Sequence, residues 1–466
     1  MMDKTDPDVV LDPGSPAADR TGSRRLGFVG VLLGVFMIVL DTTIVNVAVP
    51  RIQDDLSGTV TGMQWVVNGY NLLFAVLLLS SGAASDRHGG RKLYALGLVL
   101  FAAASLACGV AETVPVLIAA RAAQGVGSAM MLPTALALAA RLFPEPAERG
   151  RAFGQWAAVA GAATVLGPLV GGVLVDTLGW RAIFFVNIPV AIAALWLLLC
   201  HTPETPTHRH RFDLAGQGLG VIVLAAAAIA LTEAGRSGWG EAVVLAGVGI
   251  AGIAAGVMVV VERRVRAPMI PPALIGSRQF AATSVIGLIL SIGIYGQMFV
   301  LSLYLQDQRG LSAWVTGLAF LPFAAVTVVG PLVASKFLGR DKVRDTLLVG
   351  MIAGAVASLV LAFAGAQTPY PVVAIGLVLL GICQSAAQPA IASSALIGAP
   401  KQHTGVASGV LTAARQVGSV LGVALLGGLV GHDFEPGMHL ALLIVATLFG
   451  IGALVTISFV KTHKKA

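Results

Sequence analysis

Apolar residues recur along this chain of 466 residues in long runs, which short polar stretches separate. Each run is about 20 residues long, and a helix of that length crosses the roughly 30 Å hydrocarbon core of a bilayer. The runs do not alternate apolar with polar positions, as the strands of a membrane barrel do, so the pattern predicts helices. It predicts fourteen of them, over residues 27–48, 64–84, 93–111, 114–140, 154–175, 182–200, 214–232, 241–261, 280–302, 312–334, 346–366, 371–395, 405–430 and 438–460.

Two polar segments divide the predicted helices into groups. The segment "HTPETPTHRHRFD" follows the sixth helix and "ERRVRAP" follows the eighth. The predicted fold class is therefore all-α integral membrane, with two six-helix bundles plus an inserted helix pair. The expected domains are a disordered head (1–25), an N-terminal six-helix bundle (26–200), a linker with transmembrane helices 7 and 8 (201–268), a C-terminal six-helix bundle (269–460) and a tail (461–466).

The composition agrees with a membrane location. Hydrophobic residues make up 56% of the chain and charged residues 11%, so it has too little polar surface to cover itself in water. Lys and Arg orient the chain, because positive charge near the ends of spans stays in the cytoplasm. With the amino terminus inside, 24 of the 30 Lys and Arg residues fall on the inner side, so both termini are expected in the cytoplasm. The net charge of +7 then belongs to a basic inner rim against anionic lipid and requires no nucleic-acid partner.

The polar ends and linker offer few specific signals. The first 25 residues contain five Asp and three Pro, which predicts disorder. A cleaved signal peptide is the alternative, but the apolar run that follows is too long and contains Asp41. The linker histidines His208 and His210 fit a solvated basic loop; metal binding is the alternative, although no Cys or carboxylate frame surrounds them. No metal or other cofactor is expected.

The segment between the second and third predicted helices, "GAASDRHGGRK", combines glycines with adjacent acidic and basic residues. Glycines allow a tight reversal, and an Asp beside an Arg can pin two helix ends by a charge-assisted bond. A simple basic turn at the inner face is the alternative. The candidate residues of this cytoplasmic loop latch are Gly82, Asp86, Arg87, Gly89, Arg91 and Lys92.

Two predicted helices carry unusual residues along one face. In "RAAQGVGSA", a charge, an amide and two small residues recur at helical spacing from Arg121 onward. In "GQWAAVAGAATVLGPLVGG", Gly167 and Gly171 are four residues apart, as are Pro168 and Gly172. Small residues at that spacing let helices approach closely, and a proline bends a helix.

Together these segments resemble the major facilitator superfamily, and within it the fourteen-span drug:proton antiporters of the EmrB/QacA type. "LDTTIVNVAVP" is similar to their first-span signature, "GAASDRHGGRK" to their loop signature and "RAAQGVGSA" to their fourth-span signature. "WRAIFFVNIP", "YLQDQRGLSAWVTGL" and "GVASGVLTAARQVGSVLGVAL" extend the resemblance over nearly the whole chain. Two positions depart from it, Gly90 where Arg is usual and Ala163 where Gly is usual. The antiporter motif corresponds to Gly154, Gly167, Pro168, Gly171 and Gly172.

The resemblance implies export of a small amphipathic drug or antibiotic, coupled to proton entry, by a monomer that alternates access in a bacterial plasma membrane. The residues agree that the chain is not an enzyme, since no GxxxxGK[ST], HExxH or GxSxG motif is present, so a proton gradient is the expected energy source. Two alternatives stay open. One is a proton-coupled importer of a small nutrient in the same superfamily, and the other is a non-transporting membrane sensor.

Asp41 is the one acid within the predicted spans, against two bases, Arg121 and Arg415. At 1.5 Å per residue, Asp41 and Arg121 both lie roughly 10 Å below the outer edge of the hydrocarbon core. Burial disfavours the carboxylate anion and a nearby Arg favours it, so a motion that changes either influence binds or releases a proton. We hypothesise that Asp41 carries the coupling proton and that Arg121 tunes it. A static ion pair is the alternative, with Glu233 or Asp307 next in line as carriers.

The substrate cavity is expected between the two bundles, near the midplane. The spans lack the clustered carboxylates that dicationic ligands favour, so neutral or weakly charged antibiotics are the expected cargo. Taken singly, each polar candidate fits ordinary packing between helices, or a belt at the membrane interface, better than a ligand contact. The candidates are Asn46, Asn68, Asn71, Gln124, Trp156, Tyr295, Gln297, Gln384, Gln388, Arg415 and Gln416.

Overall fold

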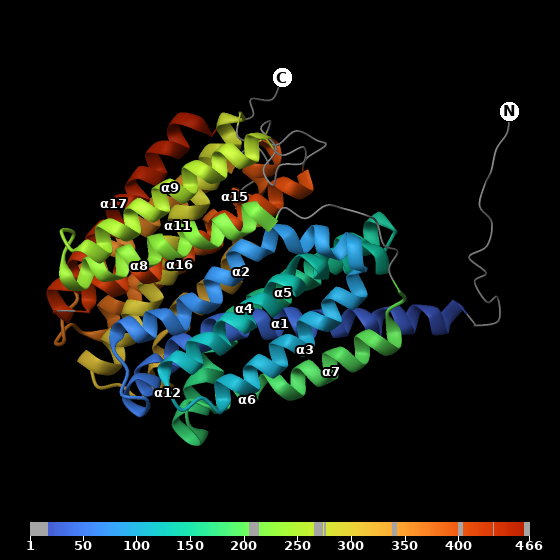
Figure 1. Cartoon of the computed structure of the whole chain (residues 1–466), viewed down its shortest axis with the longest axis horizontal. Helices are drawn as coiled ribbons and strands as arrows, with labels where there is room; N and C mark the ends of the chain where they lie inside the picture. Colours follow the sequence, from blue (N-terminus) through green and yellow to red (C-terminus); the bar gives the residue numbers. More distant parts are fainter. Residues whose placement is uncertain are drawn as a thin grey trace.

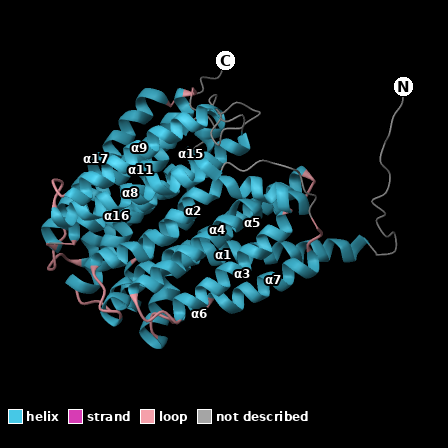
Figure 2. Cartoon of the chain, in the orientation of Figure 1, coloured by secondary structure: helices cyan, strands magenta, loops and turns pink. Residues whose placement is uncertain are grey.

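The computed structural model describes residues 17–204, 214–264, 274, 276–337, 343–398, 404–431 and 433–460. Within these ranges the chain is helical, and Figure 2 shows helices joined by loops, with no strand among the described residues. The expected all-helical membrane fold is confirmed for this part of the chain. The linker histidines His208 and His210 and the tail 461–466 lie outside the described residues.

The helices form two groups that lie side by side, with their long helices roughly aligned (Figure 1). The first group consists of α1 (Ala17–Asp55), α2 (Val60–His88), α3 (Gly90–Gly109), α4 (Val114–Leu142), α5 (Pro146–Leu178), α6 (Ala182–Phe185) and α7 (Asn187–His201). An inserted pair follows, α8 (Leu214–Ser237) and α9 (Ala242–Arg264). The second group consists of α11 (Arg278–Leu303), the π-helical turn η1 (Tyr304–Gln308), α12 (Ala313–Ala319), α13 (Leu321–Phe337), α14 (Val343–Ala362), α15 (Tyr370–Gly398), α16 (Thr404–Val430) and α17 (Phe434–Phe459).

Twelve helical stretches of the described residues are long and apolar enough to cross a membrane, so the expected count of fourteen is not supported. The two expected spans that are missing correspond to α2 and α8. α2 has 29 residues, but Gln64, Asn68 and Asn71 lower its hydropathy. α8 has 24 residues, and its described side chains form a continuous apolar stretch over Gly218–Ala234. The count of twelve covers the described residues, and α2 and α8 stay predicted spans.

α1 begins at Ala17, earlier than the predicted first span, and runs to Asp55. Part of the segment expected to be a disordered head is therefore helical, while residues 1–16 lie outside the described residues. Pro50 lies inside the helix. A proline has no backbone N–H to donate to the carbonyl four residues earlier, which here belongs to Asn46. α1 packs against α5 and α7 of its own group and also touches α11 and α12 of the second.

The inserted pair lies against both groups. Leu224 of α8 belongs to one apolar cluster with Val76 of α2 and Val420 of α16. A Cβ added at Gly428 of α16 would lie 2.9 Å from the carbonyl oxygen of Leu231, so α8 and α16 approach at backbone distance. α9 packs on α8 and leaves most of its own apolar surface exposed (Figure 1). α8 therefore bridges the seam between α2 and α16.

Candidate transport site

A buried ion pair joins α1 to α4. Asp41 and Arg121 are 0% and 1% exposed, and the Arg121 guanidinium donates to Asp41 Oδ2. The same guanidinium donates to Gln124 Oε1 at 2.8 Å and, from Nε, to the Val66 carbonyl at 3.2 Å. The two charges that the sequence placed at one depth are therefore in direct contact.

Two amides complete the surroundings of Asp41. Asn187 of α7 donates to Asp41 Oδ1 at 3.1 Å, and Gln124 donates to the same oxygen at 3.3 Å. The Gln124 amide also donates to Ser105 Oγ of α3 at 2.7 Å. Four helices thus meet around one carboxylate. Sequence reasoning missed Ser105 and Asn187; the one amide in the segment "WRAIFFVNIP" was the available signal for Asn187.

These contacts are what allow the charges to be buried. Ions taken out of water are costly unless a partner and hydrogen bonds replace the lost solvation. The Arg121 guanidinium also lies 4.4 Å from the centroid of the Tyr70 ring, whose hydroxyl bonds Ser128 Oγ at 2.7 Å. Removing one partner from such a pair leaves an uncompensated charge, at a cost of about 3–5 kcal/mol.

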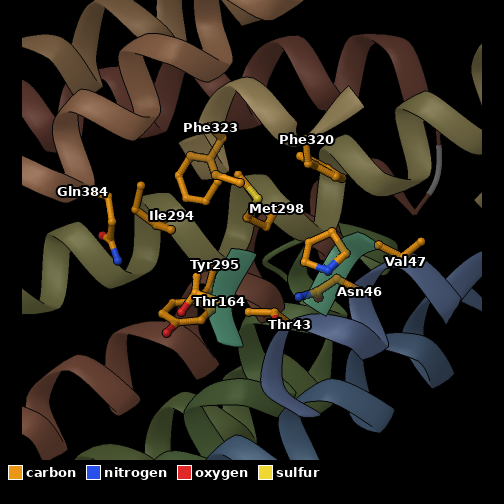
Figure 3. Close-up of a pocket in the computed structure, with 12 residues that line it drawn as sticks. Thr43, Asn46, Val47, Thr164, Ile294, Tyr295, Met298, Phe320, Phe323 and Gln384 are labelled. Carbon is orange, nitrogen blue, oxygen red and sulfur yellow. The ribbon is translucent and has the colours of Figure 1, made fainter. Parts of the chain in front are cut away.

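A cavity lies between the two helix groups, beside the same stretch of α1 (Figure 3). Asn46, Tyr295 and Gln384, three of the expected lining residues, contribute to its wall. Hydroxyls and amides reach it from both groups, and none of the twelve lining residues carries a formal charge. The lining residues are Thr43, Asn46, Val47, Thr164, Pro168, Ile294, Tyr295, Met298, Phe320, Phe323, Ala324 and Gln384.

Four of the expected cavity residues lie inside the helix groups, and one of them is Gln124, whose amide belongs to the Asp41 cluster described above. Gln297 is fully buried, donating to the Gly293 carbonyl at 3.0 Å and accepting from Ser358 at 3.3 Å. Asn68 and Asn71 are buried on α2, and the side-chain oxygen of each has no hydrogen-bond partner. These residues do not line the cavity. A polar side chain in a span therefore does not by itself show which face of the helix meets the cavity.

Other candidates lie nearer the cavity or at the margin of a group. Gln388 accepts a hydrogen bond from the cavity residue Gln384 at 2.7 Å. Arg415 and Gln416 are half-buried on α16. Trp156 is half-buried and packs against the apolar cluster of the first group.

The small residues of α5 lie against helices of both groups. Cβ atoms added at Gly167 and Gly171 would collide with α1, and one added at Gly172 would lie 2.7 Å from the Ala313 carbonyl oxygen of α12. Gly154 has nothing within 4 Å of that position. Pro168 lines the cavity, and its carbonyl faces α12. Four of the five expected motif positions are therefore packed against other helices.

Two hydrogen bonds join α1 to the second group beside the cavity. Ser302 Oγ of α11 donates at 2.6 Å to the Asn46 carbonyl, the acceptor that Pro50 leaves without a helical donor. Gln306 in η1 donates to the Val47 carbonyl at 3.0 Å. We name Ser302, Gln306 and these two α1 carbonyls the gate. The gate holds the C-terminal end of α1 against the second group.

The sequence profile of the Major Facilitator Superfamily matches residues 31–423. The chain belongs to this superfamily. It is 34% identical to the methylenomycin A resistance protein of Bacillus subtilis. This match extends over 449 residues and covers 96% of each chain. It is 38% identical over 410 residues to the multidrug resistance protein Stp of Mycobacterium tuberculosis, covering 87% of this chain and 75% of that one. It is 33% identical over 419 residues to the tetracenomycin C resistance and export protein of Streptomyces glaucescens, covering 89% of this chain and 77% of that one.

Solved structures share the fold of this superfamily member. A bacterial homolog of the human lysosomal transporter Spinster, inward-facing and unoccupied, matches with a TM-score of 0.68 and 17% identity, covering 97% of this chain and 100% of that one. A POT family transporter in complex with 5-aminolevulinic acid matches with a TM-score of 0.71 and 17% identity, covering 97% and 98%. The likeness extends over the whole helical body and concerns the fold alone.

The loop motif fastens helices of the first group to each other. Gly89 ends α2 with a φ of 86°, a conformation that favours glycine. Arg91 donates from Nη2 to the Leu199 carbonyl of α7 at 2.6 Å. Lys92 lies 3.9 Å from Glu204, and both of these side chains are largely exposed. The basic residues of the motif therefore connect α3 to the end of α7.

Three further residues belong to the predicted latch. Arg87 is exposed in the last turn of α2. The side-chain positions of Gly82 and Asp86 lie outside the described residues. The charge-assisted contact expected of Asp86 stays a prediction.

Proposed function

We propose that this superfamily member is a proton-coupled antiporter that exports small amphipathic drugs or antibiotics by alternating access. The names of its relatives, which concern methylenomycin A resistance, multidrug resistance and tetracenomycin C export, support the substrate class and the direction of transport. The observation that carries the proposal is the buried pair of Asp41 and Arg121, placed next to the cavity residue Thr43 on α1.

α1 links the proton site, the cavity and the gate. It carries Asp41, the lining residues Thr43 and Asn46, and the two carbonyls that the gate holds. A proton on Asp41 weakens its attraction to Arg121 and so changes the forces on α1. A drug in the cavity contacts the same helix. Proton and drug are therefore coupled through α1, and each affects the affinity of the other.

We further infer the fourteen-span arrangement of the EmrB/QacA type, with α2 and α8 as crossing helices. They have 29 and 24 residues, and at 1.5 Å per residue each reaches across the roughly 30 Å core. The excess of Lys and Arg on one side favours both termini in the cytoplasm of a bacterium, with anionic lipid against the inner rim. The protein acts as a monomer without a cofactor, and the proton gradient supplies the energy.

The test is a drug-susceptibility panel in an efflux-deficient bacterial host, with and without an uncoupler. The protein should raise resistance to at least one amphipathic antibiotic, and the uncoupler should remove the effect. In inside-out vesicles, uptake of that antibiotic should require an acidic interior. Drug accumulation in cells would indicate import instead, and unchanged susceptibility across the panel with normal membrane insertion would refute export.

A further inference from the structure

Arg415 of α16 is a half-buried cation whose buried nitrogen is unsatisfied. Its stem packs on α11, where a Cβ added at Gly287 would lie 3.3 Å from Arg415 Cγ, with Ile391 of α15 bordering the same position. Its Nε is buried and has no hydrogen-bond partner. A guanidinium has five donors and no acceptor, and a buried donor without a partner costs free energy. The Nε donor of Arg415 therefore lacks an acceptor among the described residues.

No carboxylate of the described residues supplies that acceptor. Asp41, the buried acid, already accepts from Arg121, Gln124 and Asn187. The cavity wall contains no acid either. Arg415 takes part in none of the ion pairs between described residues, among which are Lys92 with Glu204, Arg121 with Asp41 and Arg181 with Asp55.

The cavity extends toward Arg415 along α15, because Ile391, which borders the position where the Arg415 stem packs, is seven residues, about two turns, from the lining residue Gln384. Tyr295 lines the cavity from α11, the helix on which the Arg415 stem packs. On α15, Gln384 donates to Gln388 Oε1 at 2.7 Å, which leaves the amide nitrogen of Gln388 available to a ligand. The rest of the cavity wall in Figure 3 is largely aliphatic and aromatic. This arrangement suits a molecule with an apolar body and an end that accepts hydrogen bonds.

We propose that Arg415 binds the anionic end of an amphipathic substrate, a carboxylate or a comparably acidic group, while the apolar body occupies the cavity. The inference rests on the proposed export function and names its substrate class. It departs from the neutral cargo that the sequence led us to expect. A guanidinium suits this task, because its planar fork binds a carboxylate through two parallel hydrogen bonds. Proton carrier and substrate anchor then lie in different helix groups.

The test is equilibrium binding to the purified full chain in detergent, without a proton gradient. The probes are fusidic acid and nalidixic acid, each beside its methyl ester, at neutral pH. At least one acid should bind about tenfold more tightly than its ester, which corresponds to about 1.4 kcal/mol. Arg415→Gln should remove this preference and Arg415→Lys should keep part of it. Arg278→Gln, the same change at an exposed position of α11, should leave the preference intact.

Thermal unfolding of each variant shows whether it folds. If Arg415→Gln does not fold, the test rests on the binding of acid and ester to the wild type and to Arg415→Lys. Equal binding of acid and ester to the wild type, no binding of either acid, or a preference that survives Arg415→Gln would overturn the inference. Because the binding assay does not measure export, failure of the anion site can be told apart from failure of the proposed function. A preference for acids without export in cells counts against export, whereas export of neutral drugs without that preference counts against the anion site.

Discussion

At the scale of single residues, Asp41 is a buried acid that accepts hydrogen bonds from three neighbouring side chains. Its two oxygens accept hydrogen bonds from Arg121, Asn187 and Gln124, which stabilise the anion, while complete burial disfavours it. The donors come from α4 and α7, so a movement of α1 relative to either helix changes the balance. The proton exchange that we propose for Asp41 is therefore tied to the packing of the first group of helices.

We predict that Asp41→Asn abolishes uphill, proton-driven export. Asn has the size and hydrogen-bonding capacity of a protonated Asp but cannot bind or release the proton. The substitution also leaves Arg121 without its counter-charge, so the thermal stability should fall, by about 3–5 kcal/mol for a fully uncompensated charge. Drug uptake into inside-out vesicles under an imposed pH gradient measures the effect.

Downhill drug movement through the same variant is the control for folding. If Asp41→Asn exports drug uphill at the wild-type rate and an uncoupler still stops it, proton coupling belongs to another acid. Glu233 and Asp307 are the next candidates.

At the scale of elements, α5 packs against its neighbours through glycines. Gly167 and Gly171 face α1, and Gly172 faces α12. Within a membrane, lipid competes with apolar side chains for contact, so helices gain most by approaching closely over small residues. The antiporter motif expected from the resemblance is, at these three positions, a surface that lets α5 touch both helix groups.

We predict that Gly171→Leu destabilises the protein and blocks transport. The first added atom would lie 2.8 Å from Ile44 Cγ1, so α1 and α5 would have to separate. Overpacking of this kind costs about 1–3 kcal/mol or more. Gly161→Leu is the matched control on the same helix, because nothing lies within 4 Å of its Cβ position. Thermal unfolding and drug export measure both variants, and equal behaviour of the two would place this face of α5 against lipid.

At the scale of the whole molecule, several hydrogen bonds between the two helix groups lie at one end of the cavity. Besides the gate, Asp176 of α5 accepts from the Trp314 backbone N–H at 2.8 Å, where α12 begins and a carboxylate is favourable. In a protein that alternates access, such contacts must break when this end opens. α8 touches both groups along another seam, so its contact with α2 or with α16 must also adjust.

We predict that the double substitution Ser302→Ala and Gln306→Leu shifts the protein toward opening at the gate. Each lost hydrogen bond is worth about 0.5–1.5 kcal/mol. A total of about 1.4 kcal/mol changes the ratio of open to closed molecules about tenfold. The readout is labelling by an impermeant maleimide of Val47→Cys, which replaces a fully buried residue. Cys200, the exposed one among the three cysteines, is first replaced by Ser.

Ser284→Ala is the matched control for the gate variant. Ser284 lies on the same helix but donates within it, to the Phe280 carbonyl at 3.0 Å. Its removal should leave the labelling rate of Val47→Cys unchanged. A gate variant that labels no faster than this control would show that these hydrogen bonds do not hold the end closed.

The sequence by itself determined the helical membrane fold and the depth of its charged residues. Transfer of an apolar run into hydrocarbon is a sum over neighbouring residues, so a local pattern is enough to locate most of the spans. The constant rise of a helix likewise placed Asp41 and Arg121 at one level before any contact was known. In α2 three amides interrupt the apolar run, and they are buried inside the protein.

Only the tertiary structure decided which side chains meet. Asn187 bonds Asp41 across 146 positions of the chain, and Ser302 bonds the Asn46 carbonyl across 256. Tyr295 and Gln297 are two residues apart on α11, yet the first lines the cavity and the second is buried in the core. The rotation of each helix and its choice of partner depend on packing over its whole surface, and no single segment of the sequence contains that information.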